Sequence, residues 1–176
     1  RFCQLVLHLQ EGWLAYHFWS MKKLRIYVDT SVIGGCFDPE FKQWSLALVD
    51  DFRHGTYIPV ISDVTAAEVS PAPSFVRELH AEMLALPAEV VGVSEEAISL
   101  ASSYEAHSVL GARFRNDMLH IALATIADVD VLVSWNFRHI VRLDKIRLFN
   151  AVNIEQGYKP VSIYSPREVI SYGQED

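Results

Sequence analysis

The sequence predicts a single α/β domain, with a mainly parallel central β-sheet flanked by helices on both faces. A chain of 176 residues, 51% of them hydrophobic, can bury one sizeable core. Short β-prone segments alternate along it with longer segments whose apolar residues recur at helical spacing. Such alternation is typical of parallel strands joined by helices. No repeat, low-complexity tract or linker divides the chain.

The folded domain is expected to begin at Met21, just before the first predicted strand. Residues 1–20 have neither the basic leader nor the small-residue cleavage site of a secretory signal. We interpret them as an N-terminal extension that is either non-native or the product of a mis-assigned start. Residues 21–176 then form the one folded domain.

The first predicted elements are a strand, a helix and a second strand. The β-prone residues at 24–28 predict a short strand, which ends at Asp29 and is followed by the turn-forming pair Gly34-Gly35. Apolar residues at helical spacing predict a helix over 41–52. Residues 57–61 are again β-prone and predict the second strand.

The middle of the chain is predicted to be mostly helical. A helix should begin at Asp63 and end before Pro71, because proline lacks the amide hydrogen that a helix needs. A longer helix should occupy residues 74–86, and Pro87 should close it. Residues 90–93 are expected to form the third strand.

The last part of the chain contains the most apolar predicted helix. Gly111 should end a helix over 94–110. The next segment, 116–127, is apolar almost all round, which marks a helix buried on most of its circumference. A strand at 130–134 should precede a mostly helical stretch over 137–153. The final strand and turn are expected at 160–164 and 166–170.

Charge and cysteine content exclude several classes of protein. The net charge of −7 gives no global positive field, so a site for a polyanion must be local or assisted by a metal. Cys3 and Cys36 form neither a disulfide framework nor a zinc-binding pattern, which favours a reducing compartment, the cytoplasm. No apolar run reaches the about 18 to 20 residues of a membrane span, and we expect a soluble protein.

Polar residues that follow strands are the first candidates for a site, because sites in open parallel sheets form beyond the carboxyl ends of the strands. Asp29 follows the first strand, and Glu68 lies on the helix after the second. Asp117 begins the apolar helix, and Asn136 follows the strand at 130–134. Taken alone, Asp29 is well explained as the cap of a turn and Asn136 as a turn residue.

Glu68 has two structural explanations. It could form a capping box with Thr65, since Thr-x-x-Glu is a signature of helix starts. If Asp63 is the cap instead, Glu68 lies in the last turn, where the helix dipole disfavours a carboxylate and another attraction, such as a bound cation, must hold it.

Asp117 would complement the helix dipole, with Asn116 as the cap. The residues around it are so apolar that an ionised group pointing inward would need a partner or a metal. His120 shares a face with Asp117 at i+3, and we favour a satisfied, partly buried imidazole over a catalytic base.

The joint occurrence of three carboxylates near one sheet edge predicts an oxygen-lined site suited to Mg²⁺ or Mn²⁺ rather than zinc. Four stretches carry a more specific signal. In order, they read YVDTSVI, SDVTAAEV, FRNDMLHIALA and VLVSWNFRHI. Together they resemble the ordered motifs of PIN-domain ribonucleases, the family that includes VapC-type toxins. The resemblance covers residues 24–165 and implies a single PIN-like domain with a divalent-metal nuclease site.

This resemblance implies roles for individual residues. Asp29, Glu68 and Asp117 correspond to the family's acids and would hold the metal, which activates water and neutralises the phosphate. Asn136 stands where many relatives carry a further Asp, and it would be an auxiliary ligand or an orienting group. That loss of one negative charge argues against a tightly held second metal. Hydrogen bonds to the site are expected from Thr30, Ser31 and Ser134.

RNA would be the substrate, and basic residues would guide its phosphates. The expected contacts are Arg113, Arg115, Arg138 and Arg142, from a basic set that also includes His139, Lys145 and Arg147. A solvated helix face explains these residues equally well. The resemblance further implies a homodimer and a small antitoxin protein that inserts a segment across the acidic site.

Two other functions remain open at this stage. One is a PIN-like RNA-binding or protein-interaction module whose metal site is weak or inactive. The other, ranked last, is a phosphotransfer or phosphatase domain with Asp29 as the nucleophile; the DxDx[T/V] pattern of such domains is missing, since Thr30 and Ser31 follow Asp29 directly.

Overall fold

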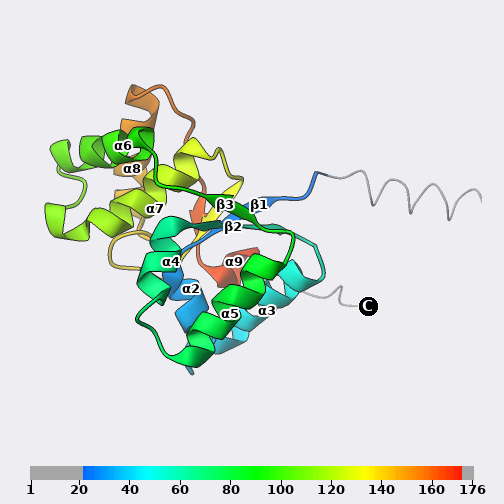
Figure 1. Cartoon of the computed structure of the whole chain (residues 1–176). Helices are drawn as coiled ribbons and strands as arrows, with labels where there is room; N and C mark the ends of the chain where they lie inside the picture. Colours follow the sequence, from blue (N-terminus) through cyan, green and yellow to red (C-terminus); the bar gives the residue numbers. More distant parts are fainter. Residues whose placement is uncertain (1–21, 172–176) are drawn as a thin grey trace, which may run out of the picture.

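The computed structural model describes residues 22–171 and contains a five-stranded, all-parallel β-sheet (Figure 1). The strands lie in the order β3-β2-β1-β4-β5. Their bounds are Arg25–Val28 for β1, Ile58–Ser62 for β2, Glu89–Val91 for β3, Val131–Val133 for β4 and Ile163–Tyr164 for β5. The predicted α/β class with a parallel central sheet is confirmed. The predicted extension at 1–20 lies outside the described residues.

Helices connect the strands and cover both faces of the sheet (Figure 1). They are α2 Thr30–Gly35, α3 Lys42–Arg53, α4 Asp63–Val69, α5 Ser74–Ala85, α6 Glu95–Ala106, α7 Arg115–Ile126, α8 Leu143–Glu155 and α9 Pro166–Val169, with a short 3₁₀ helix, η1, at Ala112–Phe114. Within residues 22–171, none of these helices is long and apolar enough to cross a membrane.

Alternation along the strands divides the apolar residues into two cores. Ile26 and Val28 of β1 point to the core shared with α2, α3 and α5. Tyr27, between them, points to the core shared with α6, α7 and α8. Because successive strand residues face opposite sides, a strand with both faces covered reads as one apolar run. The run at 24–28 was such a signal.

The helix α7 is buried on most of its circumference, as its composition predicted. The buried residues are Met118, His120, Ile121, Ala122, Leu123, Ala124 and Thr125. A helix surrounded in this way cannot shift without repacking the core, so the backbone that carries the residues of its first turn is held in position. Asp117 is one of them.

The prediction of a turn at Gly34-Gly35 was wrong, because residues 30–35 form helix α2. Gly35 is needed there for close packing. A Cβ atom at this position would lie 2.7 Å from Ser45 Oγ and 2.8 Å from Trp135 Nε1. The glycine therefore lets α2 approach α3 and the loop after β4.

Two predicted helix bounds were also wrong. Helix α6 ends at Ala106 rather than near residue 110, and Ser108 adopts a positive φ of 56°. Helix α8 begins at Leu143 rather than near residue 137. Asn136 holds the intervening turn, since its carbonyl oxygen accepts hydrogen bonds from the amide of Ile140 at 2.9 Å and from the next amide.

Candidate active site

Asp29 lies directly after β1, buried beneath the carboxyl edge of the sheet, with 5% of its surface exposed. Its backbone begins α2, but its side chain makes no capping hydrogen bond to that helix. The carboxylate oxygen Oδ2 instead accepts hydrogen bonds from Ser134 Oγ at 2.6 Å and from Ser31 Oγ. A simple turn cap does not describe this carboxylate, since hydroxyl groups from two segments orient it.

Glu68 lies in the last turn of α4, and the capping box with Thr65 is wrong. Ser62 caps the helix, accepting a hydrogen bond from the backbone amide of Thr65 at 3.2 Å. Asp63 is the first residue of α4 and not its cap. The carboxylate of Glu68 therefore lies at the helix end where the dipole disfavours negative charge.

Three neighbouring side chains hold Glu68 in this position. Thr30 Oγ1 donates to Oε2 at 2.6 Å, and Asn116 Nδ2 donates to Oε1 at 2.8 Å. His120 Nε2 lies 3.2 Å from Oε2. The hydrogen bond with His120, helped by the one from Thr30, lowers the pKa of Glu68 to about 2 despite its partial burial. The prediction that Asn116 caps α7 was wrong. The cap position is Phe114, and the Asn116 side chain contacts Glu68 instead.

His120 is the side chain that connects the acids, and it was not predicted as a site residue. It is 1% exposed, and its Nδ1 lies 2.8 Å from the Tyr27 hydroxyl. Its Nε2 lies 3.3 Å from Asp29 Oδ1 as well as close to Glu68. Burial would lower the pKa of His120, but the hydrogen bond with Glu68 and the charge of Asp29 outweigh it and raise the pKa. Both ring nitrogens have partners, as expected for a satisfied imidazole.

Asp117, in the first turn of α7, is held from the loop after β4. His139 Nδ1 lies 2.8 Å from Oδ2, and Asn136 Nδ2 donates to Oδ1 at 3.1 Å. The amide oxygen of Asn136 accepts from the backbone amide of His139 at 3.0 Å. Burial raises the pKa of Asp117, and the charge of Asp29 adds to this against the opposing effect of His139.

The structure brings the three predicted acids to the wall of one cavity of about 550 Å³. The cavity is lined by Asp29, Thr30, Ser31, Gly34, Gly35, Asp38, Phe41, Glu68, Asp117, Trp135 and Asn136. We call it the acidic cavity. Ligand atoms of Asp29, Glu68 and His120 lie within 4.8 Å of one another, a group that could hold a metal ion. Asp117 lines the same cavity but stands outside this group.

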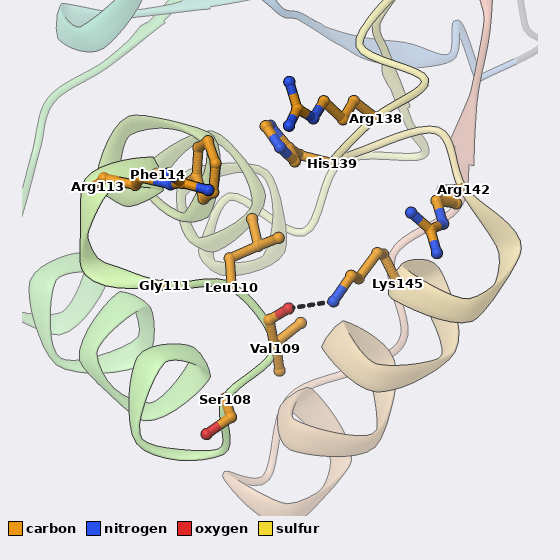
Figure 2. A pocket seen from close by; sticks show the side chains of 10 residues that line it. All are labelled: Ser108, Val109, Leu110, Gly111, Arg113, Phe114, Arg138, His139, Arg142 and Lys145. Atoms are coloured by element: carbon orange, nitrogen blue, oxygen red, sulfur yellow. Dashed lines mark hydrogen bonds between the residues drawn. The ribbon is translucent and has the colours of Figure 1, made fainter.

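A second cavity, of about 270 Å³, is lined by several basic side chains (Figure 2). It is lined by Ser108, Val109, Leu110, Gly111, Arg113, Phe114, Arg138, His139, Arg142 and Lys145. We call it the basic pocket. In Figure 2, side chains from the loop before α7 face side chains from the loop after β4 across it, and Lys145 Nζ donates to the Val109 carbonyl at 2.5 Å.

Three of the four arginines predicted to bind RNA line the basic pocket. They are Arg113, Arg138 and Arg142. Arg142 also pairs with Asp144 at 2.7 Å, an exposed contact. The fourth, Arg115, does not line the pocket; its guanidinium lies 3.7 Å from the Glu105 carboxylate. A solvated helix face therefore does not describe the residues that line the pocket, which come from two loops and α8, but it remains an explanation for Arg115.

His139 joins the two cavities. Its ring lines the basic pocket and packs on Phe114, with ring centroids 3.9 Å apart. Its Nδ1 contacts Asp117, which lines the acidic cavity. The Asp117–His139 contact therefore links a residue that lines one cavity to a residue that lines the other. Sequence reasoning placed His139 among the basic residues but gave it no link to Asp117.

No protein-family model matches the sequence, and no curated protein matches it. Solved structures do share its fold. A chain of FitAcB from Neisseria gonorrhoeae matches with a TM-score of 0.52 and 16% identity, over 82% of this chain and 99% of that one. A chain of VapBC2 from Rickettsia felis, bound to a DNA fragment from their promoter, matches with a TM-score of 0.50 and 13% identity, over 81% and 98%.

A third structure, FitAB bound to an IR36 DNA fragment, matches with a TM-score of 0.51 and 16% identity, over 86% of this chain and 99% of that one. Identities this low establish a common fold. The common fold extends over nearly the whole length of the three chains compared, and it is consistent with a PIN-like domain.

Proposed function

We propose that this chain is a divalent-metal-dependent endoribonuclease that hydrolyses RNA phosphodiester bonds, the toxin of a toxin–antitoxin pair. One observation carries the proposal. Asp29, Glu68 and Asp117 come from three separate segments and line a single cavity at the carboxyl edge of the sheet. Carboxylates gathered in this way repel one another unless cations compensate them.

The residues present fit a hard divalent ion. Asp29 and Glu68 offer carboxylate oxygens, which suit Mg²⁺ or Mn²⁺, and His120 offers an imidazole nitrogen close by. Asp117 already accepts hydrogen bonds from two side chains, so it would contribute its charge or act through water. When bound, the ion supplies a hydroxide nucleophile at neutral pH and positive charge beside the phosphate oxygens.

The surrounding side chains set the position of the acids. Ser31 and Ser134 orient Asp29, and Thr30 orients Glu68. Asn136 presents its amide nitrogen to Asp117, while its oxygen is engaged by the backbone. In our proposal Asn136 therefore orients Asp117 and does not bind the metal. Groups of this kind raise the precision of a site because the acids cannot rotate away from it.

The basic pocket would hold a phosphate of the same RNA. The chain as a whole is acidic, with a net charge of −7, so a local cluster of cations beside the acidic cavity is required to attract a polyanion. Arg113, Arg138 and Arg142 provide that cluster. In this arrangement the phosphate to be cut lies over the acids and a neighbouring phosphate lies among the arginines.

The fold shared with these structures supports a further part of the proposal, that the chain binds a partner protein. The chains compared come from FitAcB, FitAB and VapBC2 structures, and two of these contain DNA. We propose that this chain pairs with a small antitoxin whose segment covers the acidic cavity with a basic side chain. We propose further that it forms a homodimer and acts in the cytoplasm.

One alternative has an observation in its favour. His120 lies between Asp29 and Glu68, and its raised pKa favours a protonated ring that compensates one of their two negative charges without any metal. A chain stabilised in this way could be an RNA-binding or protein-interaction module with a weak metal site. RNA binding would then persist while cleavage is missing.

The two functions are separated by a cleavage experiment on a mixed pool of structured RNA. The wild type, Asp29→Asn and Asp117→Asn are compared in Mg²⁺, in Mn²⁺ and in EDTA. We expect cleavage by the wild type with either metal, and none in EDTA or with either variant. RNA binding without cleavage under every metal condition would contradict the nuclease and support the binding module.

A further inference from the structure

We propose that Phe137 is a stacking platform for a base of the bound RNA, an inference that rests on the proposed function. Phe137 lies in the loop after β4, and 49% of its surface is exposed. Its immediate neighbours line the two cavities: Asn136 the acidic cavity and Arg138 the basic pocket. Phe137 itself lines neither cavity, but in the chain it is flanked by one residue of each, and its ring packs beside Phe41 and Trp135 of the acidic cavity.

The loop that carries Phe137 is held firmly. The Phe137 amide donates to the Trp135 carbonyl at 2.9 Å. The Asn136 side chain accepts from the amide of His139 at 3.0 Å, and the Asn136 carbonyl accepts from Ile140 at 2.9 Å. Exposure of Phe137 is therefore built into the turn, and a rigid ring loses little conformational entropy when a ligand covers it.

Two aromatic rings support Phe137 from one side. Its centroid lies 6.0 Å from that of Trp135, with the planes tilted by 57°, and 6.5 Å from that of Phe41, tilted by 46°. Phe41 and Trp135 are themselves stacked, 4.5 Å apart, and line the acidic cavity. The rest of the Phe137 ring is left open to a ligand.

The charges around the ring favour a nucleotide as the occupant. Asp117 of the acidic cavity and His139 of the basic pocket are in contact, with side-chain atoms 2.8 Å apart. An RNA strand with one phosphate over the acids and the next among the arginines carries a base past Phe137. Proteins bind unpaired bases by stacking them on aromatic rings beside a positively charged groove.

Exposure alone does not single out Phe137. Phe75 on α5 is 48% exposed, but it packs on Phe37 with the centroids 4.6 Å apart, and its sequence neighbours line neither cavity. Phe75 is therefore a matched control, equal in exposure and chemistry but removed from the cations of the basic pocket.

The test measures binding of a short unstructured oligoribonucleotide in EDTA, by fluorescence anisotropy. A companion set of oligonucleotides carries one abasic position each. We expect Phe137→Ala to weaken binding roughly tenfold, the usual loss of one base–aromatic stack. Phe137→Trp should restore it, and Phe75→Ala should leave it unchanged. One abasic position should weaken binding by the wild type by the same factor and cause no further loss in Phe137→Ala.

Several results would overturn the inference, and they are distinguishable. If Phe137→Ala binds as the wild type does while metal-dependent cleavage persists, stacking is wrong and the nuclease stands. If the loss is the same on every abasic oligonucleotide, Phe137 acts on the backbone or the fold. A changed sedimentation coefficient with unchanged affinity makes Phe137 a protein contact. If the wild type neither binds nor cuts RNA, the proposed function fails and the stacking site with it.

Discussion

Charged side chains gather at both ends of the central sheet, but they are compensated in different ways. At the amino end, Arg25 donates to Glu89 at 2.9 and 3.0 Å through Nε, and its backbone amide donates to Asp130 at 2.8 Å. At the carboxyl end, the acids face the imidazoles of His120 and His139. The positive partners at the amino end are guanidinium and ammonium groups, whereas the partners of the acids at the carboxyl end are imidazoles, hydroxyls and amides.

This difference shows why a cluster of acids is a poor guide to function by itself. Glu89 begins β3 and Asp130 immediately precedes β4, yet both already have a cationic partner: the Arg25 guanidinium pairs with Glu89, and the Lys22 ammonium pairs with Asp130. Asp29 and Glu68 are oriented by hydroxyl groups and an imidazole. Acids that lack a permanent cation are the ones that can take up a metal ion.

The largest expected difference between the two ends is in catalysis. Glu68→Gln should reduce RNA cleavage by roughly 100-fold or more, since losing even a supporting contact of a metal ligand costs about 10- to 100-fold. Glu89→Gln is the matched control at the amino end and should leave cleavage per folded molecule unchanged. Single-turnover cleavage rates measure both. Equal rates for wild type and Glu68→Gln would remove Glu68 from the site.

Stability, in contrast to cleavage, should depend on the amino end of the sheet. Arg25→Ala removes hydrogen bonds to Glu89 and to the carbonyls of Ala127 and Asp128. We expect the free energy of unfolding to fall by about 1–3 kcal/mol, the range for hydrogen bonds to charged or buried groups. Urea denaturation measures it, with cleavage per folded molecule as the control. An unchanged urea midpoint would mean that the amino-end network is not structural.

A smaller effect is expected from pH, measured on the metal-free protein in EDTA. The raised pKa of His120 means that its contribution to stability is fully present below its ordinary value of 6.5 and is lost as pH rises through the folded pKa. The pKa of Glu68, lowered from 4.5 to about 2, gives a contribution that is present above pH 4.5 and lost as pH falls. Thermal melts should therefore show that His120 and Glu68 contribute most to stability between pH 4.5 and pH 6.5.

His120→Gln isolates the alkaline part of this dependence. As pH rises above 6.5, the wild type should lose the stability that protonated His120 contributes. The variant lacks this contribution and should not show the loss. The Arg25–Glu89 pair at the amino end should cause no change in stability near neutral pH. The pKa of Arg25 is raised and that of Glu89 is lowered, so both groups stay charged there. Identical alkaline profiles for wild type and variant would show that His120 does not stabilise the acids.

The smallest expected effect is on RNA affinity through a single cation. Arg138→Gln should weaken binding to all sequences alike and reduce the slope of log affinity against log salt by about 1. Lys159→Gln is the control, since Lys159 pairs with Asp128 at 2.6 Å on the exposed surface and lines neither cavity. A salt slope that is unchanged in Arg138→Gln would take Arg138 out of the phosphate path.

Much of the fold followed from the sequence because the strands and α7 are apolar enough to be recognised locally. The bounds that failed depended on contacts made far along the chain. Gly35 reads as a turn residue until Trp135 and Ser45 are seen to need the space of its missing side chain. The turn before α8 depends on the carbonyl of Asn136, which no helical pattern reveals.

The site was predictable to the extent that strand ends reveal it. Asp29, Glu68 and Asp117 follow or face such ends, and the structure places all three on one cavity. His120 was the harder residue, because a lone histidine on an apolar helix is usually a core residue. Its i+3 spacing from Asp117 was the signal, but only Tyr27 and the two carboxylates at its ring nitrogens show how it is used.

The contact between Asp117 and His139 has a thermodynamic consequence. If the acidic cavity binds a cation and the basic pocket an anion, as proposed, this contact would connect the two sites, and occupancy of one would alter the binding free energy at the other. An anion in the basic pocket that strengthens the affinity of the acidic cavity for a cation must itself be bound more tightly, by the same factor, when the cation is present. Under the proposed function, cation and RNA would then be heterotropic effectors of each other.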